Sequence, residues 1–314
     1  MADTKIIAVM GATGAQGGGL VRAIQADPAS GFIARAITRD ANSDAAKQLA
    51  ALGAEIVEAN IDDGPSIARA FEGAHGALCV TFYWAHMNPE REIAEAHTLA
   101  DAAKQAGVKH AIWSTLEDTR KWVPLSSDQM PTIHDHYKVP HFDTKGESNR
   151  FFHDVPTTYL LTSFYWDNLI NFGMNPKPDG QGGYVFALPM DNAKLPGIAA
   201  EDIGRSAYGI FKQGDAAIGK TIGIAGEHLT GAEMAAALSE VLGINCRHLA
   251  ISPADYRALG FPGADDLGNM FQFKRDFEAD FRGPRDVAAT RALDPELQDF
   301  RAYLTANKDR IPLT

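Results

Sequence analysis

The sequence has few cysteines and no Cys-x-x-Cys pair of the kind that holds a metal. Its 314 residues include only Cys79 and Cys246, which could form at most one bridge. Cys79 stands in the apolar run 77–80, which favours a buried thiol that packs as a small hydrophobe over a reactive one. Two isolated cysteines exclude a disulfide-dense secreted scaffold and fit a reducing cytosol.

Long apolar runs are also missing. No stretch of about 18 consecutive apolar residues occurs, and residues 1–10 enter an apolar strand without a basic leader or a cleavage site. We therefore expect neither export nor a membrane span, and predict a cytoplasmic protein.

Basic side chains are scarce as well: 29 Lys and Arg face 40 Asp and Glu, which gives a net charge of −11. A general nucleic-acid or anionic-membrane binder needs a basic face, so both classes are disfavoured. Hydrophobic residues at 45% and charged residues at 22% exclude disordered, collagenous and coiled-coil chains. The composition is that of an ordinary globular protein.

Short β-branched and apolar runs alternate with helix-like segments such as residues 90–106. Strands buried on both faces read as continuous apolar runs, and a β-α-β repeat makes a parallel sheet. The fold class predicted is therefore α/β, a Rossmann-type doubly wound parallel sheet. Its six expected strands are residues 5–10, 32–38, 55–61, 76–83, 110–116 and 157–163.

The regular alternation of strand-like and helix-like segments ends after residue 163. Residues 175–183 are rich in Pro and Gly and lead to a short expected strand at 184–188. Thr230 to Glu233 forms a capping box that opens a helix, and Ser252-Pro253 begins another. We expect a dinucleotide-binding domain at 1–163 and a smaller C-terminal α+β lobe at 164–314 that completes the cleft, with elements crossing between them.

A glycine loop follows the first strand and precedes a helix. Glycines let the backbone turn sharply and approach a pyrophosphate, which is met by the free N–H groups of the helix end. The spacing Gly11-x-x-Gly14-x-x-Gly17 is that of short-chain dehydrogenases. Its place at the first strand of a β-α-β array predicts dinucleotide binding over a plain strand-to-helix turn.

Arg39 stands at the end of the second strand, where an acid would bind the ribose hydroxyls of NAD. A guanidinium instead matches a 2′-phosphate, so the sequence predicts NADP(H) over NAD(H). The alternative is a solvated charge at the end of a strand.

Two segments resemble the catalytic elements of short-chain dehydrogenases. Ser114 lies near the end of the fifth strand, and His141 is followed four residues later by Lys145. In those enzymes a Tyr occupies the position of His141 and donates a proton, while the Lys holds the nicotinamide ribose. His141 is thus a candidate proton donor here, with a purely structural histidine as the alternative.

Aromatic residues follow the fourth and sixth strands at 82–84 and 164–166. Strand ends line the ligand crevice of such sheets, so Phe82 and Tyr83 are expected beside the nicotinamide, although half of these aromatics could be ordinary core. Tyr83 is a second candidate acid. A loop holds His134, His136 and Tyr137 without an acidic or thiol partner at ligand spacing, which favours a lid or surface loop, and no metal site is expected.

The chain resembles the NmrA-like family, and within it the HSCARG type of atypical short-chain dehydrogenase, over about residues 4–312. The resemblance rests on the glycine loop, Thr38-Arg39, Val80-Thr81-x-Tyr83-Trp84, His141-Phe-Asp-x-Lys145-Gly-Glu147, Tyr165-x-x-Asn168 and residues 261–271. It implies NADP(H) binding by Gly11, Ala12, Thr13, Gly14, Ala15, Gln16, Arg39, Asn60, Thr81, Tyr83, Lys145, Tyr165 and Asn168. The turn at 40–44 differs from the more basic version in relatives, since it contains no Lys or Arg.

The same resemblance leaves the function divided. Some members look like redox sensors that bind NADP(H) and a regulatory protein partner without turnover, and the missing Tyr fits them. Neighbouring branches look like NADPH-dependent reductases of planar quinones, dyes, imines or carbonyl compounds, and Lys145, Ser114 and the aromatic rim fit those. A third reading is a homodimeric scaffold stabilised by its nucleotide. We expect a reductase, with the sensor as the alternative.

Overall fold

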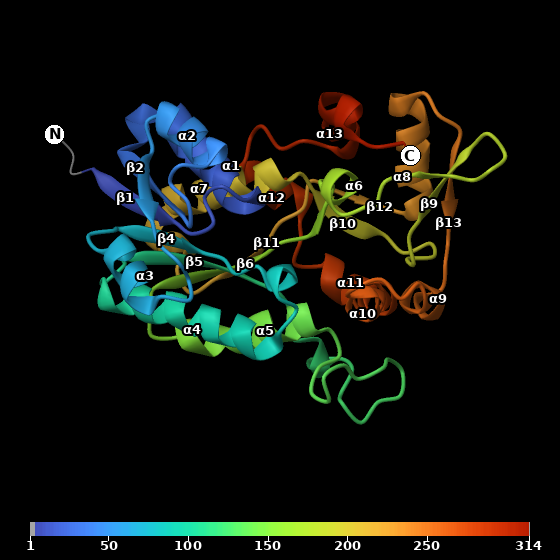
Figure 1. Ribbon diagram of the computed structural model, residues 1–314, viewed down its shortest axis with the longest axis horizontal. Coiled ribbons are helices and arrows are strands. Elements are labelled where there is room, and N and C mark those ends of the chain that lie inside the picture. Colours follow the sequence, from blue (N-terminus) through green and yellow to red (C-terminus); the bar gives the residue numbers. More distant parts are fainter. Residues whose placement is uncertain (1–3, 314) are drawn as a thin grey trace.

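A seven-stranded parallel sheet forms the centre of the larger lobe in the computed structural model, which describes residues 4–313 (Figure 1). The strand order is β11-β6-β5-β4-β1-β2-β3, so the order reverses beside β1, as in doubly wound folds. The strands are β1 Lys5–Val9, β2 Phe32–Thr38, β3 Glu55–Glu58, β4 Gly76–Cys79, β5 His110–Thr115, β6 Thr157–Leu161 and β11 Thr221–Gly223.

Helices cover both faces of this sheet (Figure 1). One face carries α1 Ala15–Ala26, α2 Asp44–Ala51, α7 Ala200–Gln213 and α12 Val287–Leu293, and the other carries α3 Gly64–Phe71, α4 Pro89–Gln105 and α5 Pro140–Ser148. Two buried apolar clusters lie between the sheet and these helix layers. The predicted doubly wound α/β fold is therefore confirmed.

The helices α1 and α7 touch through glycine. A Cβ added at Gly204 of α7 would collide with the backbone nitrogen of Leu20, and one at Gly19 of α1 would lie 2.6 Å from the carbonyl oxygen of Glu201. Only glycine permits this approach. The position of α1, the helix that follows the glycine loop, is thus fixed by direct backbone contact with α7 from the C-terminal half of the chain.

The smaller lobe contains two three-stranded sheets and a cluster of helices (Figure 1). The first sheet has the order β12-β10-β7 and the second β13-β9-β8. Its strands are β7 Phe164–Tyr165, β8 Lys177–Pro178, β9 Tyr184–Ala187, β10 Leu195–Ile198, β12 Glu227–Leu229 and β13 Cys246–Leu249. Its helices are α6 Asn168–Asn171, α8 Gly231–Leu242, α9 Pro253–Ala258, α10 Ala264–Asp276, α11 Glu278–Arg282 and α13 Phe300–Asn307.

The strands β3 and β4 are shorter than expected and the sheet has one strand more. Residues 59–61 and 80–83 leave the sheet and turn into loops at its carboxyl edge, where the site lies. The extra strand β11 comes from the C-terminal half and pairs in parallel with β6. Three residues between glycines carry too short an apolar signal to be recognised in the sequence. The boundary at residue 163 stays a prediction.

Helix starts in the smaller lobe agree with the sequence. Thr230 and Glu233 form the reciprocal capping box of α8, and the Ser252 side chain caps α9.

None of the helices within residues 4–313 is both long and apolar enough to cross a membrane.

Candidate functional site

The glycine loop connects β1 to α1 as the sequence predicts. Gly11 has a φ of +64°, and a Cβ at Gly17 would lie 2.5 Å from the Gly11 carbonyl oxygen, so side chains are excluded at both positions. No side chain of residues 4–313 caps α1 at Gly14. A bound phosphate could accept from the first N–H groups of this helix without displacing a cap.

The rest of the loop divides between core and surface. Ala12 is buried and its N–H donates to the Ile37 carbonyl, while Thr13 and Ala15 are exposed. Gln16 is half-buried, and its Nε2 donates to the Tyr165 hydroxyl at 2.6 Å. Its Oε1 is buried without a partner among the described residues, which marks it as an acceptor for a ligand.

Arg39 and Asn60 follow neighbouring strands at this same edge. Arg39 comes directly after β2, is exposed, and forms no ion pair or hydrogen bond with any of residues 4–313. Asn60 follows β3, and its Oδ1 accepts the N–H of Asp62. The Arg39 guanidinium is thus free for an anion that reaches the end of β2.

Lys145 of α5 is fixed beyond the carboxyl end of β4. Its Nζ donates to the Thr81 hydroxyl at 2.6 Å and the Thr81 carbonyl at 3.2 Å, and lies 2.9 Å from Glu92 Oε1. The Thr81 hydroxyl in turn donates to the same Glu92 oxygen at 2.6 Å. Thr81 and Lys145, two predicted cofactor-binding residues that are 64 positions apart in the sequence, are therefore in direct contact.

Glu92 is the residue that sequence reasoning missed. It is completely buried in α4; burial alone would raise its pKa, but the Lys145 charge, the nearby His86 ring and hydrogen bonds from Thr81 and Lys145 lower that pKa to about 2. The signal was present, because Glu92 shares one helix face with the apolar Ala96 and Leu99. A carboxylate on such a face needs a buried partner.

His141 occupies the first turn of α5 and is held from the other lobe. Its Nδ1 lies 2.6 Å from Asp266 Oδ1, and its backbone N–H donates to Asp266 Oδ2 at 3.3 Å. Asp266 belongs to α10, within the family-like stretch 261–271. An Asp at Nδ1 fixes the ring orientation and leaves Nε2 as the exchangeable position.

Ser114 lies buried within β5, and no described side chain or backbone group is hydrogen-bonded to its hydroxyl. The neighbouring Thr115 instead donates to the Lys145 carbonyl at 3.1 Å. The structure thus brings His141, Lys145 and Tyr83 to one region and puts Ser114 within the strand that supports them.

The aromatic segments split into site and core. Phe82 is 56% exposed, whereas Tyr83 is 3% exposed and packs edge-on against Trp84 with ring centroids 5.6 Å apart. The Tyr165 hydroxyl accepts a hydrogen bond from Gln16. Asn168, three residues later in the sequence, is half-buried and is the first residue of α6. Phe164 and Trp166 belong to the core of the smaller lobe.

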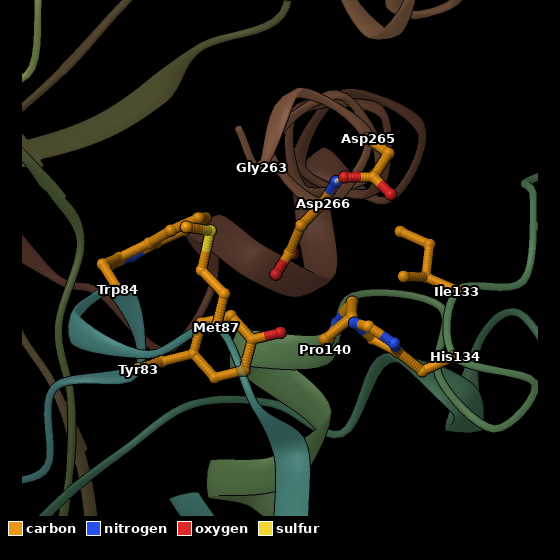
Figure 2. Close-up of a pocket in the computed structure, with 9 residues that line it drawn as sticks. All are labelled: Tyr83, Trp84, Met87, Ile133, His134, Pro140, Gly263, Asp265 and Asp266. Carbon is orange, nitrogen blue, oxygen red and sulfur yellow. Dashed lines mark hydrogen bonds between the residues drawn. The ribbon is translucent and has the colours of Figure 1, made fainter. Parts of the chain in front are cut away.

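A cavity of about 210 Å³ opens beside Tyr83 (Figure 2). Its walls come from three segments: the turn after β4, the loop before α5, and the start of α10. The residues that line it are Tyr83, Trp84, Met87, Ile133, His134, Pro140, Gly263, Asp265 and Asp266. Gly263, with a φ of +83°, lets the Trp84 ring approach, since a Cβ there would lie 2.7 Å from it.

The loop with His134, His136 and Tyr137 packs against the smaller lobe. The ammonium of buried Lys138 donates to Ser127 O and Met130 O at 2.8 Å each, and Asn269 Nδ2 donates to the Lys138 carbonyl. His134 and His136 are exposed, while Tyr137 is buried. This loop contributes Ile133 and His134 to the wall of the cavity.

A separate cluster of residues contains atoms of the kind that bind metal ions. His86, Glu92 and Glu95 place three such atoms within 4.8 Å of one another, with His86 Nε2 3.6 Å from each carboxylate. However, the Asn88 N–H donates to His86 Nδ1, which keeps the proton of the neutral ring on Nε2. Glu92 also raises the pKa of His86, and both carboxylates have basic partners. This geometry anchors Glu92 and is poorly suited to a metal ion.

The sequence profile of the NmrA-like family matches residues 3–304. The chain belongs to the NmrA-like family. The NmrA-like oxidoreductase FrzB of Cladobotryum sp. is 29% identical over 310 residues, which cover 93% of this chain and 90% of FrzB.

Solved NmrA-like structures have the same fold. NmrA, a negative transcriptional regulator in complex with NADP, superimposes with a TM-score of 0.78 at 25% identity over 96% of this chain and 95% of NmrA. NmrA has also been crystallised with NAD. The Citrobacter sp. triphenylmethane reductase, complexed with NADP(H), has a TM-score of 0.68 at 21% identity over 96% of this chain and 99% of the reductase. The same fold is thus found in a transcriptional regulator and in a reductase.

Proposed function

We propose that this NmrA-like protein binds NADP(H) and reduces a planar small molecule: a quinone, an imine, a carbonyl compound or a dye. The observation that carries the proposal is the Lys145 ammonium, fixed by Glu92 and by Thr81, which stands two residues before the Tyr83 that lines the cavity. A sheet of this kind binds ligands at the carboxyl edge of its strands, where these residues lie.

Three features support the cofactor. The uncapped N-terminus of α1 offers N–H groups to a pyrophosphate, and the unpartnered Gln16 Oε1 offers an acceptor. Arg39 at the end of β2 suits a 2′-phosphate by charge and by its fork of donors. NmrA and the Citrobacter reductase bind NADP(H) on the same fold.

The cofactor would supply hydride, and the chain's own residues would supply position and charge. By its resemblance to the lysine of short-chain dehydrogenases, Lys145 would hold ribose hydroxyls, and its Nζ would exchange one of its three contacts with Thr81 and Glu92 for them. His141, oriented by Asp266, and the Tyr83 hydroxyl are the groups available to give a proton. Burial and nearby carboxylates raise the pKa of Tyr83, so its hydroxyl stays protonated at neutral pH.

The test is to offer the protein a panel of quinones, aldehydes, imines and triarylmethane dyes. Turnover of each acceptor is measured as the loss of NADPH absorbance. Lys145→Ala should lower kcat/KM by about 100-fold or more, since it removes both charge and positioning. His141→Phe tests the proton donor, and Lys47→Ala on the exposed surface of α2 is the matched control. Tight NADPH binding without turnover on every acceptor would defeat the reductase.

A redox sensor is the second candidate. His141 replaces the usual Tyr acid and its Nδ1 is engaged by Asp266, and NmrA, at 25% identity, is a transcriptional regulator. A sensor would bind NADPH and NADP⁺ with different affinities, measured by calorimetry, and would turn over neither. A homodimer and a cytoplasmic location stay predictions, checked by analytical ultracentrifugation and by cell fractionation.

A further inference from the structure

The cavity beside Tyr83 has an unusual balance of charge. Two of its lining residues, Asp265 and Asp266, are acidic, and none of the nine is Lys or Arg. Asp266 is paired with His141 Nδ1 at 2.6 Å, so Asp265 supplies the carboxylate that is not in an ion pair among residues 4–313. Figure 2 shows the Asp266 side chain directed from the start of α10 toward the space above Tyr83. Asp265 is exposed; its Oδ1 accepts the Asp266 N–H, and its Oδ2 has no hydrogen-bond partner among residues 4–313.

An aromatic and a polar group complete the wall opposite the acids. The Trp84 ring borders the cavity, and an aromatic face attracts cations. Tyr83 is 97% buried, its hydroxyl points into the cavity in Figure 2, and no group within the described chain is hydrogen-bonded to it. The hydroxyl therefore faces the cavity with its hydrogen-bonding capacity available, and a ligand in the cavity can supply the partner.

We propose that this cavity admits a planar acceptor with a delocalised positive charge, of the iminium class. The inference rests on the proposed reductase function and names its substrate. Carboxylates and an aromatic face are the groups that recognise such a cation, and a 210 Å³ cavity holds a small ring system.

The chemistry balances without a proton donor. Hydride from NADPH forms a new C–H bond at the iminium carbon, and the π electron pair of the C=N⁺ bond moves to nitrogen, which becomes a neutral amine. NADPH leaves as NADP⁺, so two electrons and one hydrogen are transferred and no proton is needed. This is the reduction that suits a site in which His141 stands in place of the usual acid.

A neutral acceptor fits the same cavity poorly. Hydride addition to a quinone or a carbonyl compound places negative charge on oxygen, next to Asp265 and Asp266. Like charges at that distance repel, and the product anion would need a proton in the same step. The acidic wall therefore selects against neutral acceptors as well as for cations.

The acidic residues of the cavity affect substrate binding more than hydride transfer. Positive charge leaves the acceptor as hydride arrives, so the carboxylates stabilise the bound substrate at least as much as the transition state. Such binding affects KM and leaves kcat nearly unchanged. Removing one charge from the wall should therefore raise KM for a cation alone.

The experiment compares N-methyl-3,4-dihydroisoquinolinium with 1,4-naphthoquinone, two bicyclic acceptors of similar size and different charge. For Asp265→Asn we expect KM for the cation to rise about fivefold with kcat unchanged. For the quinone we expect no loss and a small rise in kcat/KM, because one repelling charge is removed. Asp280→Asn on α11 makes the same charge change outside the cavity and should alter neither. Equal reduction of both acceptors by wild type, with no effect of Asp265→Asn, would overturn the inference and leave the reductase intact.

A binding measurement separates the two hypotheses. Benzyltrimethylammonium accepts no hydride, so its binding to the NADPH complex, followed by calorimetry, is independent of turnover. Wild type should bind it about fivefold more tightly than Asp265→Asn. If neither acceptor is reduced, the reductase function fails, and this ratio alone decides the cation site: a ratio near one refutes it.

Discussion

Lys274 is buried in α10 and forms no ion pair with an acidic residue among residues 4–313. It is 3% exposed; its Nζ lies 3.3 Å from Met270 Sδ, 5.0 Å from the Phe281 ring centroid and 5.3 Å from that of Phe142. Burial and the Arg285 charge lower the pKa of Lys274 to about 7. We predict that Lys274→Met stabilises the protein, since methionine fills similar space and carries no charge.

The size of the gain follows from proton linkage. The folded-state pKa of about 7 lies below the unfolded value of about 10.5, so the unfolded state binds more protons and wild-type stability rises with pH between those values. Charge burial therefore destabilises wild type by up to about 4 kcal/mol at pH 7 and about 2 kcal/mol at pH 9. The advantage of Lys274→Met should shrink accordingly as pH rises.

Urea unfolding at pH 7, 8 and 9 measures this difference. Lys47→Met on the exposed face of α2 makes the same chemical change in solvent and should show no pH-dependent gain. A Lys274→Met protein no more stable than wild type at pH 7, or one whose advantage is constant up to pH 9, would refute the reasoning.

Three further changes test the cofactor site and the core. Arg39→Asp should weaken NADPH binding by about 10- to 100-fold and spare NADH, measured by calorimetry; an unchanged preference would remove Arg39 from the phosphate site. Glu92→Gln should lower the free energy of unfolding by about 3 kcal/mol at neutral pH, because it leaves a buried ammonium unpaired. Since the pKa of Glu92 falls to about 2 on folding, this difference should shrink as pH falls from 4.5 toward 2; a constant difference would contradict the pairing. Gly204→Ala should lower the melting temperature by about 10 °C or more through its clash with α1. Gly64→Ala should not, because a Cβ there would make only an ordinary contact with Thr98 Cγ2 at 3.8 Å; equal effects would show that the close approach is unimportant.

Local patterns predicted the part of the site that depends on one strand and its turn. The glycine loop and Arg39 could be placed because each directly follows a strand, and all parallel strands end at one edge. The cofactor-binding roles of Thr81 and Lys145 came from the family resemblance. The hydrogen bond between their side chains was not predicted, since 64 residues separate the two positions.

Partners from distant segments could not be read from the sequence. Asp266 lies 125 residues from His141, and nothing in the spacing of either shows that α10 places its first turn on α5. Glu92 left a local trace as a charge on an apolar face, but its three partners come from different elements. The cavity itself belongs to the packing of two lobes.

The strand β11 has a consequence for how the sheet is made. Its residues pair with β6 but follow it by about sixty positions, so β6 emerges from the ribosome with one edge bare. At about 5–20 residues per second, that edge stays open for several seconds. An unpaired strand is a template for wrong pairing, and a fragment that ends at residue 163 would keep it permanently. The nascent sheet is thus most vulnerable while the chain from β7 to β11 is still being synthesised.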